Sequence, residues 1–181
     1  LDVIVYRTTR AKKLYELAKY SSIPVINGLN DNTHPCQLVA DIMTFEENIG
    51  IINNKVVSWC GDFNNVCRSW VQASSILNFD LHIACPKQLI NKDEMNKINK
   101  IKSIKIFDSA ENACKNSDCV MTDTWFSMGQ ITSEKKRNLL KPFQINNKIL
   151  SIAKKKIYFY ALFTSTQRRR SRKKYFRTSQ I

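Results

Sequence analysis

The sequence lacks the features that mark several common classes of enzyme and binding protein. It has four glycines among 181 residues and contains neither a G-x-G-x-x-G turn nor a P-loop, so a nucleotide cofactor is not indicated. The two histidines and six cysteines include no C-x-x-C pair, which leaves a zinc site poorly supported. No apolar run is long enough to span a membrane, and we expect no membrane association.

The cysteines and the first residues indicate the compartment and the extent of the chain. Several cysteines lie in apolar, strand-like runs, where Cys behaves as a small hydrophobe. Reduced thiols in a cytoplasmic protein are the preferred interpretation. The chain starts at Leu1 inside a strand-like run, without an initiator Met or a signal-peptide pattern, so we expect an N-terminal portion to be missing.

Strand-like runs alternate with helical patterns along most of the chain. This alternation predicts an α/β fold with a largely parallel sheet flanked by helices on both faces. Ligands of such sheets bind beyond the carboxyl ends of the strands, so polar residues at those ends are the candidates for function. Strands are predicted at 2–7, 23–28, 55–62, 81–86, 104–109 and 119–125, and helices at 8–20, from about 35, and at 66–77, 87–102, 110–116 and 134–140.

Two of the predicted strand ends carry amide or imidazole side chains. In "THPCQLVAD", His34 and Gln37 lie one turn apart at a helix start, beside free backbone N–H groups that suit an anion or a carbonyl oxygen. Taken alone, this motif is more simply a helix cap with an incidental histidine. In "GDFNNV", Asn64 and Asn65 offer donors and acceptors without net charge, although capping of the next helix accounts for at least one of them.

A third strand end, "TDTWFSMGQ", combines a carboxylate with an apolar loop. Asp123 ends a buried strand and is followed by a Trp-Phe-Ser-Met-Gly run. A carboxylate in this position could hold an ammonium group beside an apolar wall. The simpler alternative is a capping Asp followed by a loop that folds into the core.

Together, HPCQ, GDFNN and DTWFSMG in this order resemble the signature set of the ornithine carbamoyltransferases. The stretch "ELAKYSSIPVINGLNDNTHPCQLVADIMT" is also similar to that family, and the resemblance runs from Leu1 to about Lys156. The D-x-x-x-S-M-G form separates these enzymes from the aspartate carbamoyltransferases. The resemblance implies the end of a carbamoyl-phosphate domain at 1–34, a linking helix at 35–48, and an incomplete, Rossmann-like ornithine-binding domain at 49–156.

The resemblance also implies a reaction and the residues that carry it. The carbamoyl group of carbamoyl phosphate is transferred to L-ornithine, giving citrulline and phosphate in arginine biosynthesis, without a metal or redox cofactor. Intact members are typically homotrimers. Arg7 and His34 are the implied catalytic residues. The implied ligands of carbamoyl phosphate are Arg7, His34, Pro35, Cys36 and Gln37, and those of ornithine are Asn64, Asn65, Asp123, Ser127 and Met128.

The sequence departs from the family pattern at three places. The early S-T-R-T phosphate loop of the family would precede Leu1 and is not in the sequence. Phe63 stands where many members have Gly or another small residue. After "ILSIAKKK" the family continues close to "IFMHCLPAHRGEEV", whose Cys and Arg complete the active site, whereas this chain reads "IYFYALFTSTQRRRS".

The segment 154–181 accounts for most of the net charge of the chain. The net charge is +14, but ten of the 29 basic residues and none of the acidic ones lie after Ala153, which leaves 19 basic and 15 acidic residues, or +4, before it. A nucleic-acid-binding tail is the alternative function, because basic residues interleaved with Tyr and Phe suit phosphates and stacked bases. Such binding would weaken steeply with salt.

A shifted reading frame explains this segment better than nucleic-acid binding does. Codons can be chosen for 158–171 that, read one nucleotide later, give "IFMHCLPAHRGEEV". Lys154-Lys155-Lys156 marks a run of A bases, in which a nucleotide is easily gained or lost. We therefore expect 157–181 to be a frameshifted tail outside the fold. We also expect this chain to be inactive alone, because its sequence holds neither the phosphate loop nor the Cys of the shifted motif nor the strand that carries this Cys.

Overall fold

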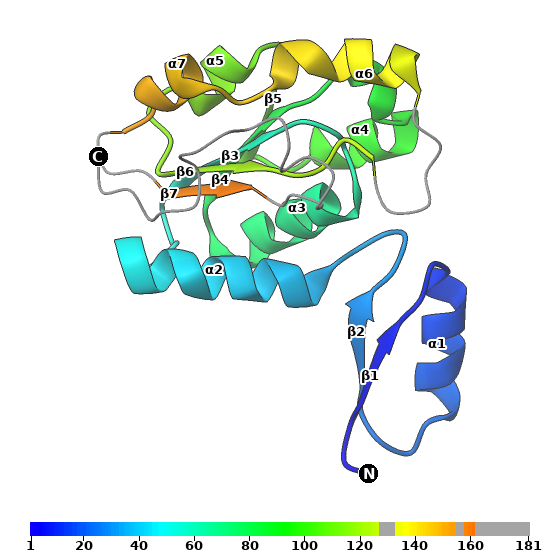
Figure 1. The fold of residues 1–181 in the computed structure, drawn as a ribbon. Helices are drawn as coiled ribbons and strands as arrows, with labels where there is room; N and C mark the ends of the chain where they lie inside the picture. Colours follow the sequence, from blue (N-terminus) through cyan, green and yellow to red (C-terminus); the bar gives the residue numbers. More distant parts are fainter. Residues whose placement is uncertain (127–132, 155–157, 162–181) are drawn as a thin grey trace.

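Two parallel sheets joined by one long helix make up the chain (Figure 1). The computed structural model describes residues 1–126, 133–154 and 158–161. The first part is a β-α-β unit that stands apart from the larger body, and helix α2 connects the two. The unit contains β1 (Ile4–Arg7), α1 (Ala11–Tyr20) and β2 (Val25–Leu29), and α2 spans Pro35–Ile49.

The larger body is a five-stranded parallel sheet with helices on both faces, as the alternating pattern predicts. Its strand order is β5-β4-β3-β6-β7, so the chain moves outward in one direction through β3, β4 and β5, and in the other through β6 and β7. Its elements are β3 (Val56–Cys60), α3 (Asn65–Leu77), β4 (Asp80–Ala84), η1 (Lys87–Leu89), α4 (Lys92–Ile98), β5 (Ile104–Phe107), α5 (Ala110–Cys114), β6 (Cys119–Thr122), α6 (Glu134–Leu140), η2 (Lys141–Phe143), α7 (Asn147–Ser151) and β7 (Tyr158–Ala161).

This strand order places a topological switch point between β3 and β6, which are adjacent and parallel. In open α/β sheets the connections on the two sides of such a point run to opposite faces, and a crevice forms beyond the carboxyl ends of its two strands. The predicted motifs GDFNN and DTWFSMG follow β3 and β6 directly. The fold therefore brings together two motifs that are far apart in the sequence.

Two apolar clusters hold the helices on the sheet. One face is covered by α2 and α3, whose side chains pack with Val57, Trp59, Leu81 and Ile83 (Figure 1). The other face is covered by α5 and α7, which pack with Cys60, Ala84 and Val120. The central strand β3 is buried on both faces, and this explains why "VVSWC" reads as a continuous apolar run with no polar alternation.

Some helix boundaries differ from the sequence-based prediction. The helix expected at 8–20 begins at Ala11, since Arg10 is extended with φ −121°. The helix expected at 87–102 is divided into η1 and α4, because the Asn91 side chain accepts a hydrogen bond from the Glu94 N–H and starts a new helix. The helix expected at 110–116 ends at Cys114, and Asn116 has a left-handed φ of 60°.

The sheet also extends further than we expected. We predicted that the strand after Lys156 would be missing and that 157–181 would lie outside the fold. Instead Tyr158–Ala161 forms β7, parallel to β6, with Phe159 opposite Val120. Aromatic residues suit strands, and this strand pairs the backbone groups that β6 would otherwise present at an open edge. The structure therefore corrects the expectation for 158–161.

No helix in the described ranges is long and apolar enough to cross a membrane.

Candidate functional site

The turn after β3 forms the centre of the candidate site. Gly61 has φ +136°, a backbone conformation that residues with a side chain rarely adopt, which explains a glycine at this position. Phe63 is buried in the core with the Arg68 guanidinium 5.2 Å from its ring centroid, so this departure from the family pattern is accommodated by packing. Asn64 is the N-cap of α3, and its Oδ1 accepts hydrogen bonds from the backbone N–H groups of Val66 and Cys67, each at 3.1 Å.

Asn64 and Asp123 meet across the switch point. Asn64 Nδ2 donates a hydrogen bond to Asp123 Oδ2 at 2.6 Å, although 59 residues separate the two in the sequence. Asp123 Oδ1 accepts a second hydrogen bond, from the Thr124 backbone N–H at 2.6 Å. The capping expected for Asn64 is therefore present, and it coexists with a direct contact between the two motifs, whereas Asp123 caps no helix among the described residues.

The Asp123 carboxylate is held in a partly desolvated place. Burial raises its pKa above the ordinary value, while the hydrogen bonds from Thr124 and Asn64 act in the opposite direction. A carboxylate whose charged form is disfavoured by burial gains most from a cation placed beside it. An ammonium group is such a cation, and its binding by Asp123 stays a prediction.

The loop before α2 is tied to the start of α3, which places the first predicted motif beside the second. The His34 backbone N–H donates to Ser69 Oγ at 2.8 Å, and Ser69 Oγ donates to the Asn65 carbonyl at 2.9 Å. Asn65 Nδ2 donates to the carbonyl oxygen of Asn30 at 2.9 Å. Two of these hydrogen bonds, those made by His34 and Asn30, thus link the loop before α2 to α3 near the HPCQ motif.

His34 is the N-cap residue of α2, but its side chain makes no capping hydrogen bond. Its Nδ1 is buried and has no hydrogen-bond partner among the described residues. Burial lowers the pKa of His34, and the nearby Arg7 guanidinium at the end of β1 lowers it further. A neutral imidazole can still donate one N–H, and a donor next to a cation suits a carbonyl oxygen that gains negative charge.

We expect the stability of the chain to fall as the pH drops through the titration of His34. Because the folded-state pKa is lower than the ordinary 6.5, the unfolded chain takes up this proton first on acidification. The contribution of His34 is therefore fully present above about pH 6.5 and is lost below it. Urea unfolding at several values between about pH 5 and 7 should give a flatter pH dependence for His34→Gln than for the wild type. Equal slopes would contradict the assignment.

Not every predicted residue has a side chain left open for a ligand. Pro35 is at the first turn of α2, where the absence of an N–H costs nothing. The exposed Cys36 thiol is directed to the Asn27 carbonyl at 3.4 Å, and Gln37 Nε2 donates to Asp41 Oδ1 at 2.7 Å. Arg7 is exposed. Ser127 and Met128 lie outside the described residues.

Two residues of the site were missed by the sequence analysis. Asn30 is 2% exposed, and its Oδ1 accepts from the N–H groups of Asn32 and Thr33 at 2.8 Å, which shapes the loop before His34. The sequence "NDN" offers a signal for such an Asx turn. Ser69 follows Asn65 by one helical turn, but no sequence pattern indicates that it contacts His34.

No group of three or more His, Cys, Asp or Glu side chains within the described ranges could hold a metal ion.

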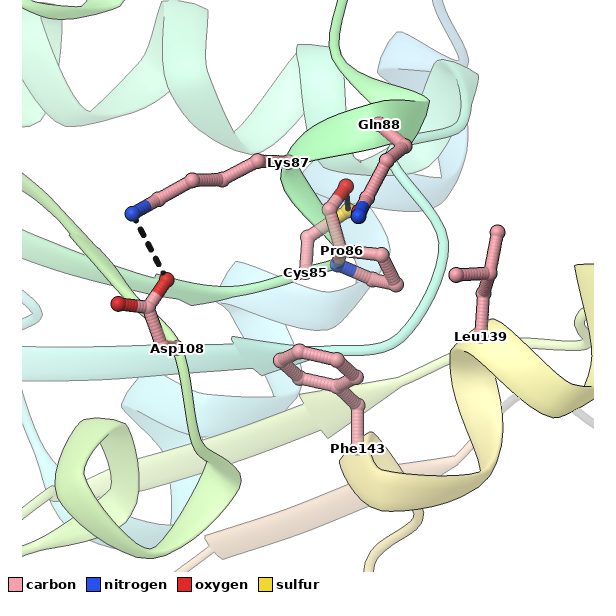
Figure 2. A pocket seen from close by; sticks show the side chains of 7 residues that line it. All are labelled: Cys85, Pro86, Lys87, Gln88, Asp108, Leu139 and Phe143. Atoms are coloured by element: carbon pink, nitrogen blue, oxygen red, sulfur yellow. Dashed lines mark hydrogen bonds and ion pairs between the residues drawn. The ribbon is translucent and has the colours of Figure 1, made fainter.

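A hollow of about 270 Å³ lies at the carboxyl ends of β4 and β5 (Figure 2). Across its rim, Lys87 Nζ pairs with Asp108 Oδ1 at 2.9 Å. Burial raises the pKa of the Cys85 thiol to about 12, so the thiol is protonated and a poor nucleophile at neutral pH. None of the predicted site residues lines this hollow. Its lining is Cys85, Pro86, Lys87, Gln88, Asp108, Leu139 and Phe143.

Comparisons with known proteins agree with the order of the motifs. Residues 1–47 match the carbamoyl-P binding domain of the aspartate/ornithine carbamoyltransferase family, and residues 53–161 match its Asp/Orn binding domain. An ornithine carbamoyltransferase of Rhodopseudomonas palustris (strain BisA53) is 44% identical over 156 residues, which are 85% of this chain and 50% of that protein. The chain thus spans about half the length of the curated relatives that it matches.

Solved structures give the same assignment of fold. The ornithine carbamoyltransferase from Pyrococcus furiosus superimposes with a TM-score of 0.81 at 35% identity, over 91% of this chain and 55% of that one. That from Burkholderia thailandensis E264 gives a TM-score of 0.80 at 31% identity, over 91% and 53% of the two chains. The match to the second domain ends at residue 161, where β7 ends.

Proposed function

Because the chain belongs to the aspartate/ornithine carbamoyltransferase family, we propose that its site binds carbamoyl phosphate and L-ornithine for transfer of the carbamoyl group. The observation that carries the proposal is the contact between Asn64 and Asp123 at the switch point, where a largely buried carboxylate accepts a hydrogen bond from an amide. The same proposal includes three properties of the family. The intact protein would be cytoplasmic, would form a homotrimer and would act in arginine biosynthesis.

The residues divide between the two substrates according to their chemistry. The Arg7 guanidinium suits the phosphate of carbamoyl phosphate, and the neutral His34 suits its carbonyl oxygen. Asp123 suits the α-ammonium group of ornithine. An asparagine amide has two N–H donors, and among the described residues Asn64 and Asn65 each donate one to the protein, which supports the second N–H of each as a donor to the ornithine carboxylate.

The reaction follows from holding these two substrates in contact. The side-chain amine of ornithine, as the free base, attacks the carbonyl carbon, and a C–N bond forms while the carbonyl electron pair moves to oxygen. Arg7 and His34 supply positive charge and a hydrogen-bond donor for this oxygen. Collapse of the tetrahedral intermediate breaks the C–O bond, the departing phosphate takes this electron pair, and the nitrogen loses its proton to that phosphate. Fixed positions for both substrates lower the entropic part of the barrier.

A binding titration and a citrulline assay test the proposal separately. We expect the 181-residue chain to bind L-ornithine in preference to L-aspartate in isothermal titration calorimetry, since L-ornithine brings a net positive charge and L-aspartate a net negative charge to the Asp123 carboxylate. We also propose that this chain forms no citrulline alone, because its sequence holds neither the S-T-R-T loop nor the Cys of the H-C-L-P motif. Citrulline formation would disprove inactivity, and preference for L-aspartate would disprove the substrate assignment.

A further inference from the structure

The turn after β3 contacts both ends of the segment 123–136. At one end Asn64 Nδ2 donates to Asp123 Oδ2 at 2.6 Å. At the other end Lys136 Nζ donates to Asp62 Oδ2, also at 2.6 Å. Asp62 and Asn64 belong to the same turn, so one short piece of chain holds the segment where it leaves β6 and where it enters α6.

The ion pair between Lys136 and Asp62 is shielded from water. Their side chains are 22% and 13% exposed, whereas the surface pair of Lys87 and Asp108 is 62% and 78% exposed. Exposed pairs contribute little because solvent and salt screen them, and a pair at this depth is screened much less. The Asp62 carbonyl also accepts a hydrogen bond from Trp59 Nε1 at 2.9 Å, which fixes the turn to a fully buried ring.

Aromatic contacts strengthen the connection between the two ends. Phe126 lies near the first end, and its ring centroid is 5.6 Å from Lys136 Nζ and 5.9 Å from Arg137 Cζ at the second. Cations at such distances are attracted to the face of an aromatic ring. Lys136 therefore contacts both the turn after β3 and the residues that follow Asp123.

The Asp62 carboxylate also acts on Asp123 electrostatically. Burial is the main cause of the raised pKa of Asp123, and the charge of Asp62 adds to it. The Lys136 ammonium group, bound to Asp62, offsets part of the charge of this second carboxylate. The ion pair of Asp62 and Lys136 thus affects both the position and the ionisation of the Asp123 carboxylate, which is expected to bind the amine.

We propose that Asp62 and Lys136 are positioning residues that hold the described ends of this segment, 123–126 and the first turn of α6, against the turn after β3 and thereby set the affinity for the amino-acid substrate. The identity of this substrate rests on the proposed function. The holding of the segment rests only on the contacts described here, so the two parts have separate tests.

Proteolysis tests whether the pair holds the segment. Chymotrypsin cleavage after Trp125 or Phe126, followed by mass spectrometry of the full chain, should be about tenfold faster in Lys136→Gln and in Asp62→Asn, as expected for loss of a charged hydrogen bond. Lys135→Gln is the matched control, since Lys135 is the exposed neighbour, and it should match the wild type. The exchange Asp62→Lys with Lys136→Asp should restore part of the protection.

The result that overturns the holding role is equal cleavage of Lys136→Gln and Lys135→Gln. Cleavage after the buried residues Phe45 and Trp70 would show that a variant has unfolded generally. In that case the double variant with exchanged charges at positions 62 and 136 distinguishes a loss of folding from a loss of the ion pair. If the exchange shows no protection beyond that of either single variant, the proposal is wrong.

Isothermal titration tests whether the contacts of Lys136 set the affinity for L-ornithine. The dissociation constant for L-ornithine should rise about tenfold in Lys136→Gln and remain unchanged in Lys135→Gln, while that for carbamoyl phosphate stays the same in both. Faster cleavage with unchanged ornithine affinity would overturn the positioning role. If the wild type binds no L-ornithine, the proposed function fails for this chain and so does the role in affinity, whereas the cleavage result still decides the holding role.

Discussion

Asp123→Asn is expected to weaken binding of L-ornithine by about a hundredfold, the loss typical of a charge-assisted contact in a desolvated site. The variant keeps one oxygen that can accept the hydrogen bond from Asn64, but its amide NH2 cannot accept the second hydrogen bond, from the Thr124 N–H, while the negative charge is removed. Isothermal titration with L-ornithine measures the change directly. Binding of carbamoyl phosphate should be unaffected, since Arg7 lies at the end of β1 and His34 in the HPCQ motif.

The stability of this variant provides a second, independent readout. Because the folded-state pKa of Asp123 is raised, the ionised carboxylate destabilises the folded chain as the pH rises above the ordinary value of 3.8. We therefore expect Asp123→Asn to unfold at no lower urea concentration than the wild type at neutral pH. Asp80→Asn, at the exposed start of β4, is the control and should leave affinity unchanged. Wild-type affinity in Asp123→Asn would contradict the assignment of the ammonium site.

Trp70→Ala should give the largest loss of stability, about 3–5 kcal/mol, which is a large part of the stability of an ordinary domain. Trp70 is fully buried between α3 and the sheet and packs edge to face on Phe79, with 5.7 Å between the ring centroids. Its removal leaves a cavity that neighbouring side chains fill only in part. Urea unfolding followed by circular dichroism measures the difference in free energy of unfolding.

Trp70→Phe is the matched control, because it keeps most of the ring volume. The Trp70 indole N–H is buried without a partner among the described residues, so its loss removes no hydrogen bond seen there. Trp59→Phe should cost more, since the Trp59 indole donates to the Asp62 carbonyl. Equal losses in Trp70→Ala and Trp70→Phe would show that packing is not the origin of the effect.

The sequence by itself determined the class of fold and the identity of the motifs. A short, mostly apolar run such as "VVSWC" is typical of a strand buried on both faces, and its alternation with helical patterns indicates a parallel sheet. The prediction that one asparagine of GDFNN caps the next helix is confirmed by Asn64, because capping depends on local backbone geometry. Family membership likewise followed from the order of HPCQ, GDFNN and DTWFSMG.

Only the tertiary structure decided which of these residues meet. Strand order cannot be read from a sequence, and it is the position of β3 beside β6 that creates the switch point and brings Asn64 to Asp123. The same holds for Ser69 with His34 and for Lys136 with Asp62, which are 35 and 74 residues apart. The strand at Tyr158–Ala161 was also missed, because pairing with β6 depends on an open neighbouring edge more than on local sequence.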